Sequence, residues 1–291
     1  MYDWPELQAA MDALWQGIAD ELRNVGMSAP AHLTRELPYD AGWTRPDLVL
    51  GQTCGLPMAT TLANKVSVVG TFDHGLESCP PGYYRSALMV PADSHVKTLD
   101  DARGKRLVIN NLDSQSGFHS VMSLLREREN ALSPAPRQLA MHTRLQSLSQ
   151  VPSNSRTPRQ TSPQPERFFA SVAVSGAHRT SLAWLHDGRA DIAAIDCHAL
   201  SLARRFGPTT DGLRTIGYTK AVPGTPLITA QHANAMGIGD AVERALDRLD
   251  IALRQELGII GLWRSTSADY LPLADAGVQV IAKRELGYCG Q

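Results

Sequence analysis

Short apolar runs alternate with amphipathic stretches along most of this chain. Apolar residues recur with helical spacing at Met11, Leu14, Ile18 and Leu22, which predicts a helix. Apolar or alternating runs predict strands at 47–52, 66–70, 83–90, 106–110, 168–176, 191–196, 213–217 and 227–230. Helices are expected at 119–129 and 179–188, and one long amphipathic helix at 238–257. Strands followed by helices in this order predict an α/β protein with two lobes.

One segment interrupts this pattern. Residues 149–166 contain four prolines, many Ser, Thr and Gln residues, no aromatic residue, and Val151 as the only aliphatic one. Such a segment cannot bury enough apolar surface to offset the entropy of ordering it. We therefore interpret residues from about 133 to 166 as a flexible insertion, and we expect that it is dispensable for folding and ligand binding.

Composition and charge exclude several classes of protein. The chain has 291 residues and a formal net charge of −1, and it has no long basic block of the kind that wraps nucleic acid. No apolar run approaches the ~18 residues of a membrane helix. The four cysteines, at positions 54, 79, 197 and 289, lack the spacing of a zinc site. The start of the sequence lacks a secretory signal pattern, so the sequence given predicts a cytosolic protein unless a leader has been removed.

The most informative segment is Asp113–Gly117, where a predicted strand passes into a predicted helix. It contains Ser114, Gln115, Ser116 and Gly117. Hydroxyls, free backbone N–H groups and the positive end of a helix dipole together suit a tetrahedral oxyanion. Plain helix capping by Ser114 or Ser116 is the alternative interpretation, and spacing alone favours it.

Other candidate residues follow predicted strands. His178 comes just after the strand that ends near Gly176, and Asp196 closes the strand at 191–196. Ligands of open α/β sheets bind beyond the carboxyl ends of the strands, although a histidine at a helix start and an N-cap aspartate are equally consistent with this spacing. Tyr84 suits either a cleft wall or a core strand.

Motifs of several enzyme classes are missing from the sequence. It contains no nucleotide P-loop, no hydrolase G-x-S-x-G elbow, no dinucleotide fingerprint and no H-E-x-x-H. The sequence therefore predicts no particular catalytic activity, cofactor or metal.

Six segments occur in an order that resembles a known family. They are Met1-Tyr2-Asp3-Trp4-Pro5-Glu6, Gly51-Gln52-Thr53-Cys54-Gly55, Gly82-Tyr83-Tyr84-Arg85-Ser86, Asp113-Ser114-Gln115-Ser116-Gly117, Ser175-Gly176-Ala177-His178 and the run 188–196. Together they resemble the phosphate-, phosphite- and phosphonate-type substrate-binding proteins of ABC importers. The resemblance extends from Met1 to about Ala230 and is interrupted by the insertion.

The resemblance implies the two-lobed type 2 periplasmic-binding-protein fold, with a ligand cleft between lobes that two crossover strands join. It implies a first lobe of residues 1–88 and 219–291 and a second lobe of residues 89–218. The crossovers would lie in residues 84–90 and 213–229. The family also implies a monomeric periplasmic protein that works with an ABC permease and needs no cofactor.

The family pattern also assigns the site residues. The serine-rich helix start and the histidine would bind the phosphonyl oxygens, and the aspartate and aromatic side chains would meet the rest of the ligand. Carried over, these residues are Ser114, Gln115, Ser116, His178, Asp196 and Tyr84, with Tyr2, Trp4, Gln52 and Thr53 as further candidates from the first lobe.

Two other functions remain open on the sequence. One is an enzyme on the same fold, of the kind that acts in thiamine-pyrimidine synthesis, which would need a reactive His178 together with Cys54 or Cys197. The other is a ligand-sensing module that signals through a partner protein. Cys54 and Cys79 fall in the same predicted lobe, as a disulfide or as two separate thiols.

Overall fold

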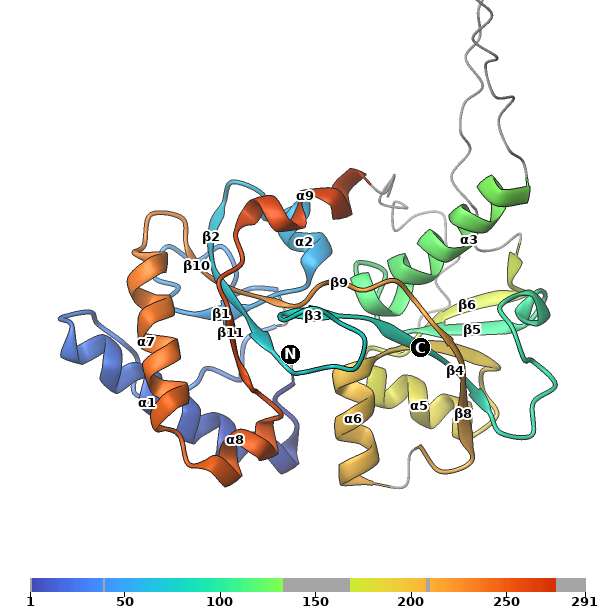
Figure 1. Ribbon diagram of the computed structural model, residues 1–291, viewed down its shortest axis with the longest axis horizontal. Coiled ribbons are helices and arrows are strands. Elements are labelled where there is room, and N and C mark those ends of the chain that lie inside the picture. Colours follow the sequence, from blue (N-terminus) through green and yellow to red (C-terminus); the bar gives the residue numbers. More distant parts are fainter. Residues whose placement is uncertain (1, 39, 133–167, 208–209, 276–291) are drawn as a thin grey trace, which may run out of the picture.

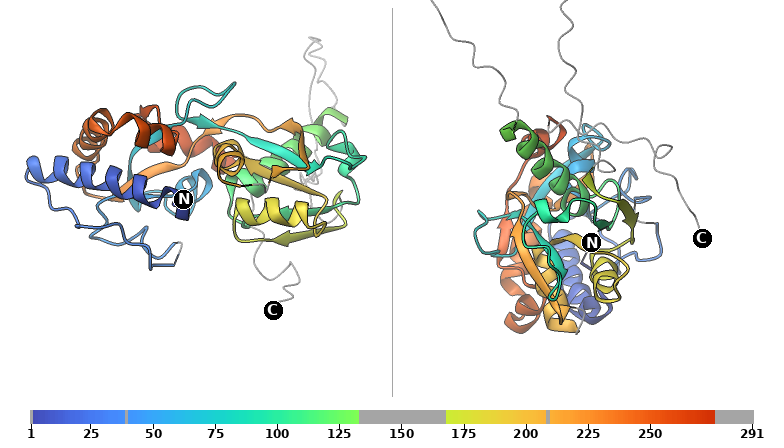
Figure 2. Two further views of the ribbon diagram at one scale, coloured as in Figure 1. Left: turned by 90° about the horizontal axis from the view of Figure 1, so that it is seen from below. Right: turned by 90° about the vertical axis from the view of Figure 1, so that its right-hand side faces the viewer.

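The chain folds into two α/β lobes, each built on its own sheet (Figure 1). The computed structural model describes residues 2–38, 40–132, 168–207 and 210–275. The predicted insertion lies outside these ranges. The left view of Figure 2 shows the two lobes side by side.

The first lobe contains an antiparallel sheet in the order β1-β10-β2-β11. Its strands are β1 (Gly51–Gln52), β2 (Val66–Asp73), β10 (Pro226–Ala230) and β11 (Gly261–Trp263). Its helical segments are η1 (Pro5–Leu7), α1 (Gln8–Asn24), α2 (Gly55–Ala59), α7 (Ala235–Arg248), α8 (Ile251–Leu257) and α9 (Ser267–Asp275). The apolar stripe predicted on the first helix packs against α7, through residues such as Leu14, Ile18 and Val242.

The second lobe contains a mixed sheet in the order β6-β5-β7-β4-β8. Its strands are β4 (Ser86–Pro91), β5 (Arg106–Ile109), β6 (Ser171–Val174), β7 (Ile192–Asp196) and β8 (Leu213–Tyr218). Its helical segments are η2 (Asp100–Ala102), η3 (Gln115–His119), α3 (Ser120–Leu132), α5 (His178–His186) and α6 (Cys197–Phe206). β5 runs parallel to both β6 and β7, so the carboxyl ends of these three strands meet at one edge of the sheet.

Both faces of the central strands of this second sheet are buried. Leu107 and Ile109 of β5 belong to the core cluster on one face, and Val108 belongs to the cluster on the other. Successive side chains of a strand point to opposite faces, and a parallel sheet with helices on both sides therefore reads as a continuous apolar run. This explains why the apolar run at 106–110 predicted its strand.

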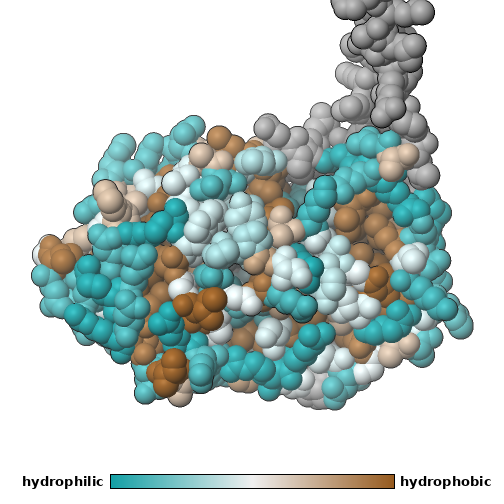
Figure 3. Space-filling model, in the orientation of Figure 1, coloured by the Kyte–Doolittle hydropathy of each residue, from teal (hydrophilic) through white to brown (hydrophobic). Residues whose placement is uncertain are grey.

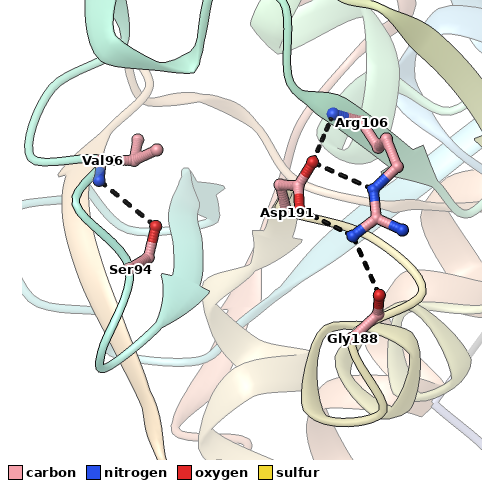
Figure 4. A network of polar contacts seen from close by, with 5 residues as sticks. All are labelled: Ser94, Val96, Arg106, Gly188 and Asp191. Atoms are coloured by element: carbon pink, nitrogen blue, oxygen red, sulfur yellow. Dashed lines mark hydrogen bonds and ion pairs between the residues drawn. The ribbon is translucent and has the colours of Figure 1, made fainter.

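An ion pair joins the starts of β5 and β7, at the edge opposite the carboxyl ends. The Asp191 carboxylate accepts hydrogen bonds from the Arg106 side chain at 2.8 and 3.1 Å and from the Arg106 backbone N–H at 2.8 Å. Arg106 also donates to the Gly188 carbonyl at 2.9 Å (Figure 4). A two-pronged contact of this kind defines the relative position of the two strands.

The crossover segments that link the two lobes are shorter than predicted. β3 (Tyr83–Tyr84) pairs with β9 (Val222–Pro223) in a separate two-stranded sheet between the lobes. The predicted strand at 83–90 is interrupted at Arg85, beyond which β4 joins the second sheet. β8 belongs to the same sheet, so residues 213–218 are not part of the returning crossover.

Two further sequence predictions need correction. The helix predicted at 238–257 is two helices, because Leu249 is extended and the Asp250 carboxylate caps α8 by accepting the Ala252 N–H at 2.8 Å. In the strand predicted at 47–52, only Gly51–Gln52 pairs with a neighbour. Cys54, Cys79 and Cys197 are free thiols, so the Cys54–Cys79 disulfide is not formed.

Hydrophilic side chains cover much of the face seen in Figure 3, and hydrophobic ones lie between them in separate patches. Across the described ranges, no helix combines the length and the apolar composition needed to cross a membrane.

Candidate ligand-binding site

The carboxyl ends of three parallel strands bring the main candidate residues together. The loop after β5 leads to Ser114, the loop after β6 leads to His178, and β7 ends at Asp196. This edge of the second lobe faces the first lobe, because the Tyr2 hydroxyl donates to Asp196 Oδ2 at 2.6 Å. The prediction that these residues share one edge of a sheet is confirmed.

The serine-rich segment forms an unusual helix start. Gln115–His119 is a single π-helical turn that continues directly into α3, and such turns are frequent at functional sites. Ser114 caps this turn, because its Oγ accepts the Gly117 N–H at 3.0 Å. Ser114 therefore does what the capping interpretation predicts, and the same cap orients the next two residues of the turn.

Ser116 has a different role from Ser114. Its Oγ lies 2.8 Å from His178 Nε2. Its carbonyl accepts hydrogen bonds from Ser86 Oγ at 2.9 Å and from Ser120 Oγ at 2.5 Å. Because the carbonyl is held twice, the Ser116 hydroxyl is fixed in position beside the imidazole.

The glycine of this turn allows a close approach of another strand end. A Cβ atom on Gly117 would lie 1.8 Å from Asn110 Oδ1 and 3.3 Å from His178 Cε1. The buried Asn110 Oδ1 accepts no hydrogen bond within the described residues. Any larger residue at position 117 would displace Asn110, so a glycine is required there for steric reasons.

The first lobe contributes polar groups to the same place. The Gln115 backbone lies close enough to the Cys54 thiol to lower its pKa, against the larger effect of burial, and Cys54 directly precedes α2. Thr53 Oγ1 and the Tyr84 hydroxyl are both buried, and neither makes a hydrogen bond within the described residues. The Tyr84 hydroxyl is nevertheless close enough to Ser116 for that residue to lower its pKa, against the larger effect of burial. Buried polar groups without partners are rare in proteins, and the Tyr84 hydroxyl beside Ser116 is one of them.

Asp196 is held by protein groups on both oxygens. Oδ1 accepts the backbone N–H groups of His198 at 2.7 Å and Ala199 at 3.1 Å, which makes Asp196 the N-cap of α6. Oδ2 accepts the hydroxyl of Tyr2 from the other lobe. Asp196 therefore connects the start of α6 to the first lobe.

Burial dominates the ionisation of these groups. It lowers the pKa of His178 to about 4, although a contact with the Ala194 backbone acts in the opposite direction and raises this pKa. It raises the pKa of Asp196, while the hydrogen bonds from Tyr2 and from α6 lower it. Burial also raises the pKa values of the Cys54 and Cys197 thiols to about 12. His178 is thus a neutral imidazole at neutral pH, and neither thiol is a thiolate.

Two predicted residues lie to the sides of this cluster. Gln52 Nε2 donates to Thr225 Oγ1 at 3.0 Å, and Gln52 lines a cavity of about 500 Å³ within the first lobe. Trp4 packs against the core of the second lobe, with the Arg179 guanidinium 4.9 Å from its ring centre. Arg179 also forms a two-pronged ion pair with Glu6, at 2.7 and 3.0 Å.

Sequence reasoning missed several residues of this region. Ser86 and Asn110 were not identified, and neither were His74 and His198, whose rings stack at 3.6 Å between centroids. A position after a strand is a signal that could have found Asn110. The contact between His74 and His198 joins two segments that are far apart in the sequence, so no local pattern could have found it. Among the described residues, no group of three His, Cys, Asp or Glu side chains could hold a metal ion.

Comparisons with known structures agree with this architecture. The PhnD1 protein of Prochlorococcus marinus in complex with methylphosphonate has a TM-score of 0.61 and 15% identity, covering 93% of each chain. The binding-protein component PA3383 of an ABC phosphonate transporter from Pseudomonas aeruginosa has a TM-score of 0.58 and 14% identity, covering 91% of this chain and 80% of that one. XAC2383 from Xanthomonas citri, bound to chloride, has a TM-score of 0.59 and 17% identity, covering 94% and 96%. At these identities the likeness establishes the two-lobed binding-protein fold.

A comparison with curated proteins gave no match. A family profile described as "ABC transporter, phosphonate, periplasmic substrate-binding protein" matches residues 57–270, which is more than half of the chain. The chain therefore belongs to the family of periplasmic substrate-binding proteins of phosphonate ABC transporters.

Proposed function

We propose that this protein binds a small phosphonate, or a related phosphorus oxyanion, between its lobes and delivers it to an ABC permease without chemical change. The observation that carries this proposal is the contact between Ser116 and His178 at the start of a helix. The buried Tyr84 hydroxyl and Thr53 Oγ1, both without hydrogen-bond partners among the described residues, support it from the first lobe.

The chemistry of these groups suits an oxyanion that must be released again. Hydroxyls, backbone N–H groups and a neutral imidazole can all donate hydrogen bonds to phosphonyl oxygens. None of them carries a permanent positive charge, so the bound anion gains directional hydrogen bonds without a strong ion pair that would slow its release. Ser114, Gln115 and Ser116 at the turn, with His178, are the proposed oxyanion ligands.

The remaining candidates surround this group. Tyr84 and Thr53 would contact the ligand from the first lobe, and Asp196 with Tyr2 would close the cleft beside it. An Asp196 carboxylate that accepts a ligand hydrogen on Oδ2, beside the Tyr2 hydroxyl, would also discriminate among ligands, because a ligand without that hydrogen would make one hydrogen bond fewer. Trp4 and Gln52 would act through the packing of the segments that carry Tyr2 and Thr53.

The family supports periplasmic localisation and an ABC permease as partner, and we propose that the protein acts as a monomer. The alternative of a cysteine-dependent enzyme on this fold has little support. A thiol whose pKa is about 12 is protonated at neutral pH and is a poor nucleophile.

A thermal-shift series would test the proposal. The purified protein is heated with phosphate, phosphite, methylphosphonate or 2-aminoethylphosphonate, and with sulfate as control. A ligand at 100 times its Kd stabilises the folded protein by about 2.7 kcal/mol, which corresponds to a rise in Tm of roughly 5–10 °C for a chain of this size. We expect a rise with at least one phosphorus oxyanion and none with sulfate. No shift with any of them, in folded protein, would refute the proposal.

A further inference from the structure

Two histidines from different lobes stack on each other. His74 directly follows β2 of the first lobe, and its Nδ1 lies 2.8 Å from the carbonyl oxygen of Gly258 at the end of α8. His198 is the second residue of α6 in the second lobe. The two ring centroids are 3.6 Å apart, and the ring planes differ by 19°. Face-to-face stacking at this distance leaves no room for water between the rings.

The histidine pair is continuous with the Tyr2–Asp196 contact. The Tyr2 ring meets His198 edge-on at 4.5 Å and His74 at 5.7 Å between centroids. The hydroxyl of the same tyrosine donates to Asp196 Oδ2, and Asp196 Oδ1 accepts the His198 backbone N–H. Separation of the lobes would therefore break the stack and the Tyr2–Asp196 hydrogen bond together.

The charged groups around the pair lie on several elements. Asp73 lies at the end of β2 and raises the pKa of His74, whereas Arg205 of α6 lowers that of His198. Arg205 also donates to the Glu256 carbonyl of α8 at 2.8 Å, which is another contact between the lobes. Asp196, at the end of β7, contacts the backbone N–H of His198. The phenol of Tyr2 stays neutral, because burial raises its pKa well above the usual value.

We propose that the stacked pair of His74 and His198 is an acid-sensitive latch that holds the lobes closed over the ligand and keeps Tyr2 and Asp196 in position. This inference rests on the proposed function for its ligand, although the closing of the lobes can be tested without one. Two imidazolium ions in this geometry would repel each other at short range in a site from which water is excluded. Protonation therefore drives the lobes apart.

The direction of the pH effect follows from the burial of the rings. Burial lowers the pKa of His74 to about 4 and that of His198 well below its usual value. In an open form, both rings would titrate near the ordinary histidine value of about 6.5. Closure is then fully favoured above about pH 6.5 and weakens as the pH falls below it. Between pH 7.5 and 5.5, each histidine lowers the equilibrium constant for closure of the lobes about tenfold. Protonation of Asp196, whose pKa is raised by burial, acts in the opposite direction.

The first test uses the protein without ligand. Small-angle X-ray scattering at pH 7.5 and 5.5 measures the radius of gyration, and far-UV circular dichroism checks that the protein stays folded. We expect the radius to increase at pH 5.5 in the wild type and to increase clearly less in His198→Phe, which keeps a flat ring at position 198 and leaves His74 as the one ring of the pair that can take up a proton. The exposed His232 gives a matched control, and His232→Phe should behave as the wild type. An equal response in the wild type and His198→Phe would overturn the proposal.

The second test measures the Kd for methylphosphonate at both pH values. The ratio of the Kd at pH 5.5 to that at pH 7.5 should be about tenfold smaller in His198→Phe than in the wild type. Titration of the ligand and of His178 contributes equally to both proteins and cancels in this comparison. If His198→Phe does not fold, His74→Gln replaces it, because the amide can still donate to the Gly258 carbonyl. Equal ratios would refute the latch but not the proposed function. If methylphosphonate does not bind at all, the proposed function is in doubt, and the scattering result alone decides on the latch.

Discussion

Replacing Ser116 with alanine removes the hydroxyl that lies 2.8 Å from His178 Nε2. The rest of the turn should persist, because the Ser116 carbonyl still accepts hydrogen bonds from Ser86 and Ser120. In the free protein, the buried imidazole loses one partner, which costs about 1 kcal/mol of stability. The variant should therefore be folded, with a slightly lower Tm.

The larger effect is expected on ligand affinity. Ser116 is only 4% exposed, and a buried hydroxyl that donates to an anionic oxygen contributes a charge-assisted hydrogen bond. Its loss should weaken binding by about 1–3 kcal/mol, which is roughly 5- to 150-fold in Kd. Isothermal titration calorimetry at pH 7.5 with the oxyanion that gives the largest thermal shift measures this change directly.

A matched control comes from the same lobe. Ser94 lies in the loop after β4, where its Oγ accepts the Val96 N–H at 3.2 Å (Figure 4). This loop is at the edge of the sheet opposite Ser116, so Ser94→Ala should leave the Kd unchanged. If Ser116→Ala is folded and its Kd stays within about twofold of the wild type, then Ser116 does not bind the ligand and the assignment of the turn is wrong.

Three other substitutions separate structural roles from binding roles. Ser114→Ala removes the cap on the Gly117 N–H and should lower stability by about 1 kcal/mol in chemical denaturation; an unchanged stability would show that the cap contributes nothing. Gly117→Ala places a Cβ against Asn110 Oδ1 and should cost about 1–3 kcal/mol of stability. The double variant with Asn110→Ala should recover part of this loss, and no recovery would mean that the clash lies elsewhere. Asp196→Asn keeps an oxygen for the α6 cap or for Tyr2 and should change the order of ligand affinities more than the Tm, whereas equal losses for every ligand would contradict a role in selectivity.

Local patterns in the sequence were sufficient for much of the fold. The spacing of Leu14 and Ile18 predicted α1, and the apolar runs predicted β2, β5 and β7, because strand and helix periods depend on near neighbours in the chain. The same patterns did not predict the break between α7 and α8, where a side-chain cap interrupts the helix. The side chain of Asp250 caps a new helix in the middle of an otherwise continuous amphipathic pattern, and its hydrogen bond leaves no trace in the hydropathy pattern.

The candidate site was only partly accessible to sequence reasoning. Ser114, His178 and Asp196 follow strands, and the rule for carboxyl ends was enough to place them at one edge of the sheet. That rule could not say that Ser114 caps the turn while Ser116 meets the imidazole. Both are serines in the same short motif, and the backbone of a π-helical turn decides which hydroxyl points to His178.

Contacts between the lobes could not be predicted from the sequence. Tyr2 meets Asp196 across 194 positions of the chain, and His74 stacks on His198. Such contacts depend on how two separately folded sheets are held by the short pairing of β3 and β9. The sequence by itself determined the secondary structure of each lobe and the strand ends that carry polar groups, since these depend on short-range hydrogen bonding and side-chain period. The tertiary structure alone decided which of those groups meet between the lobes, because the packing of whole lobes brings them together.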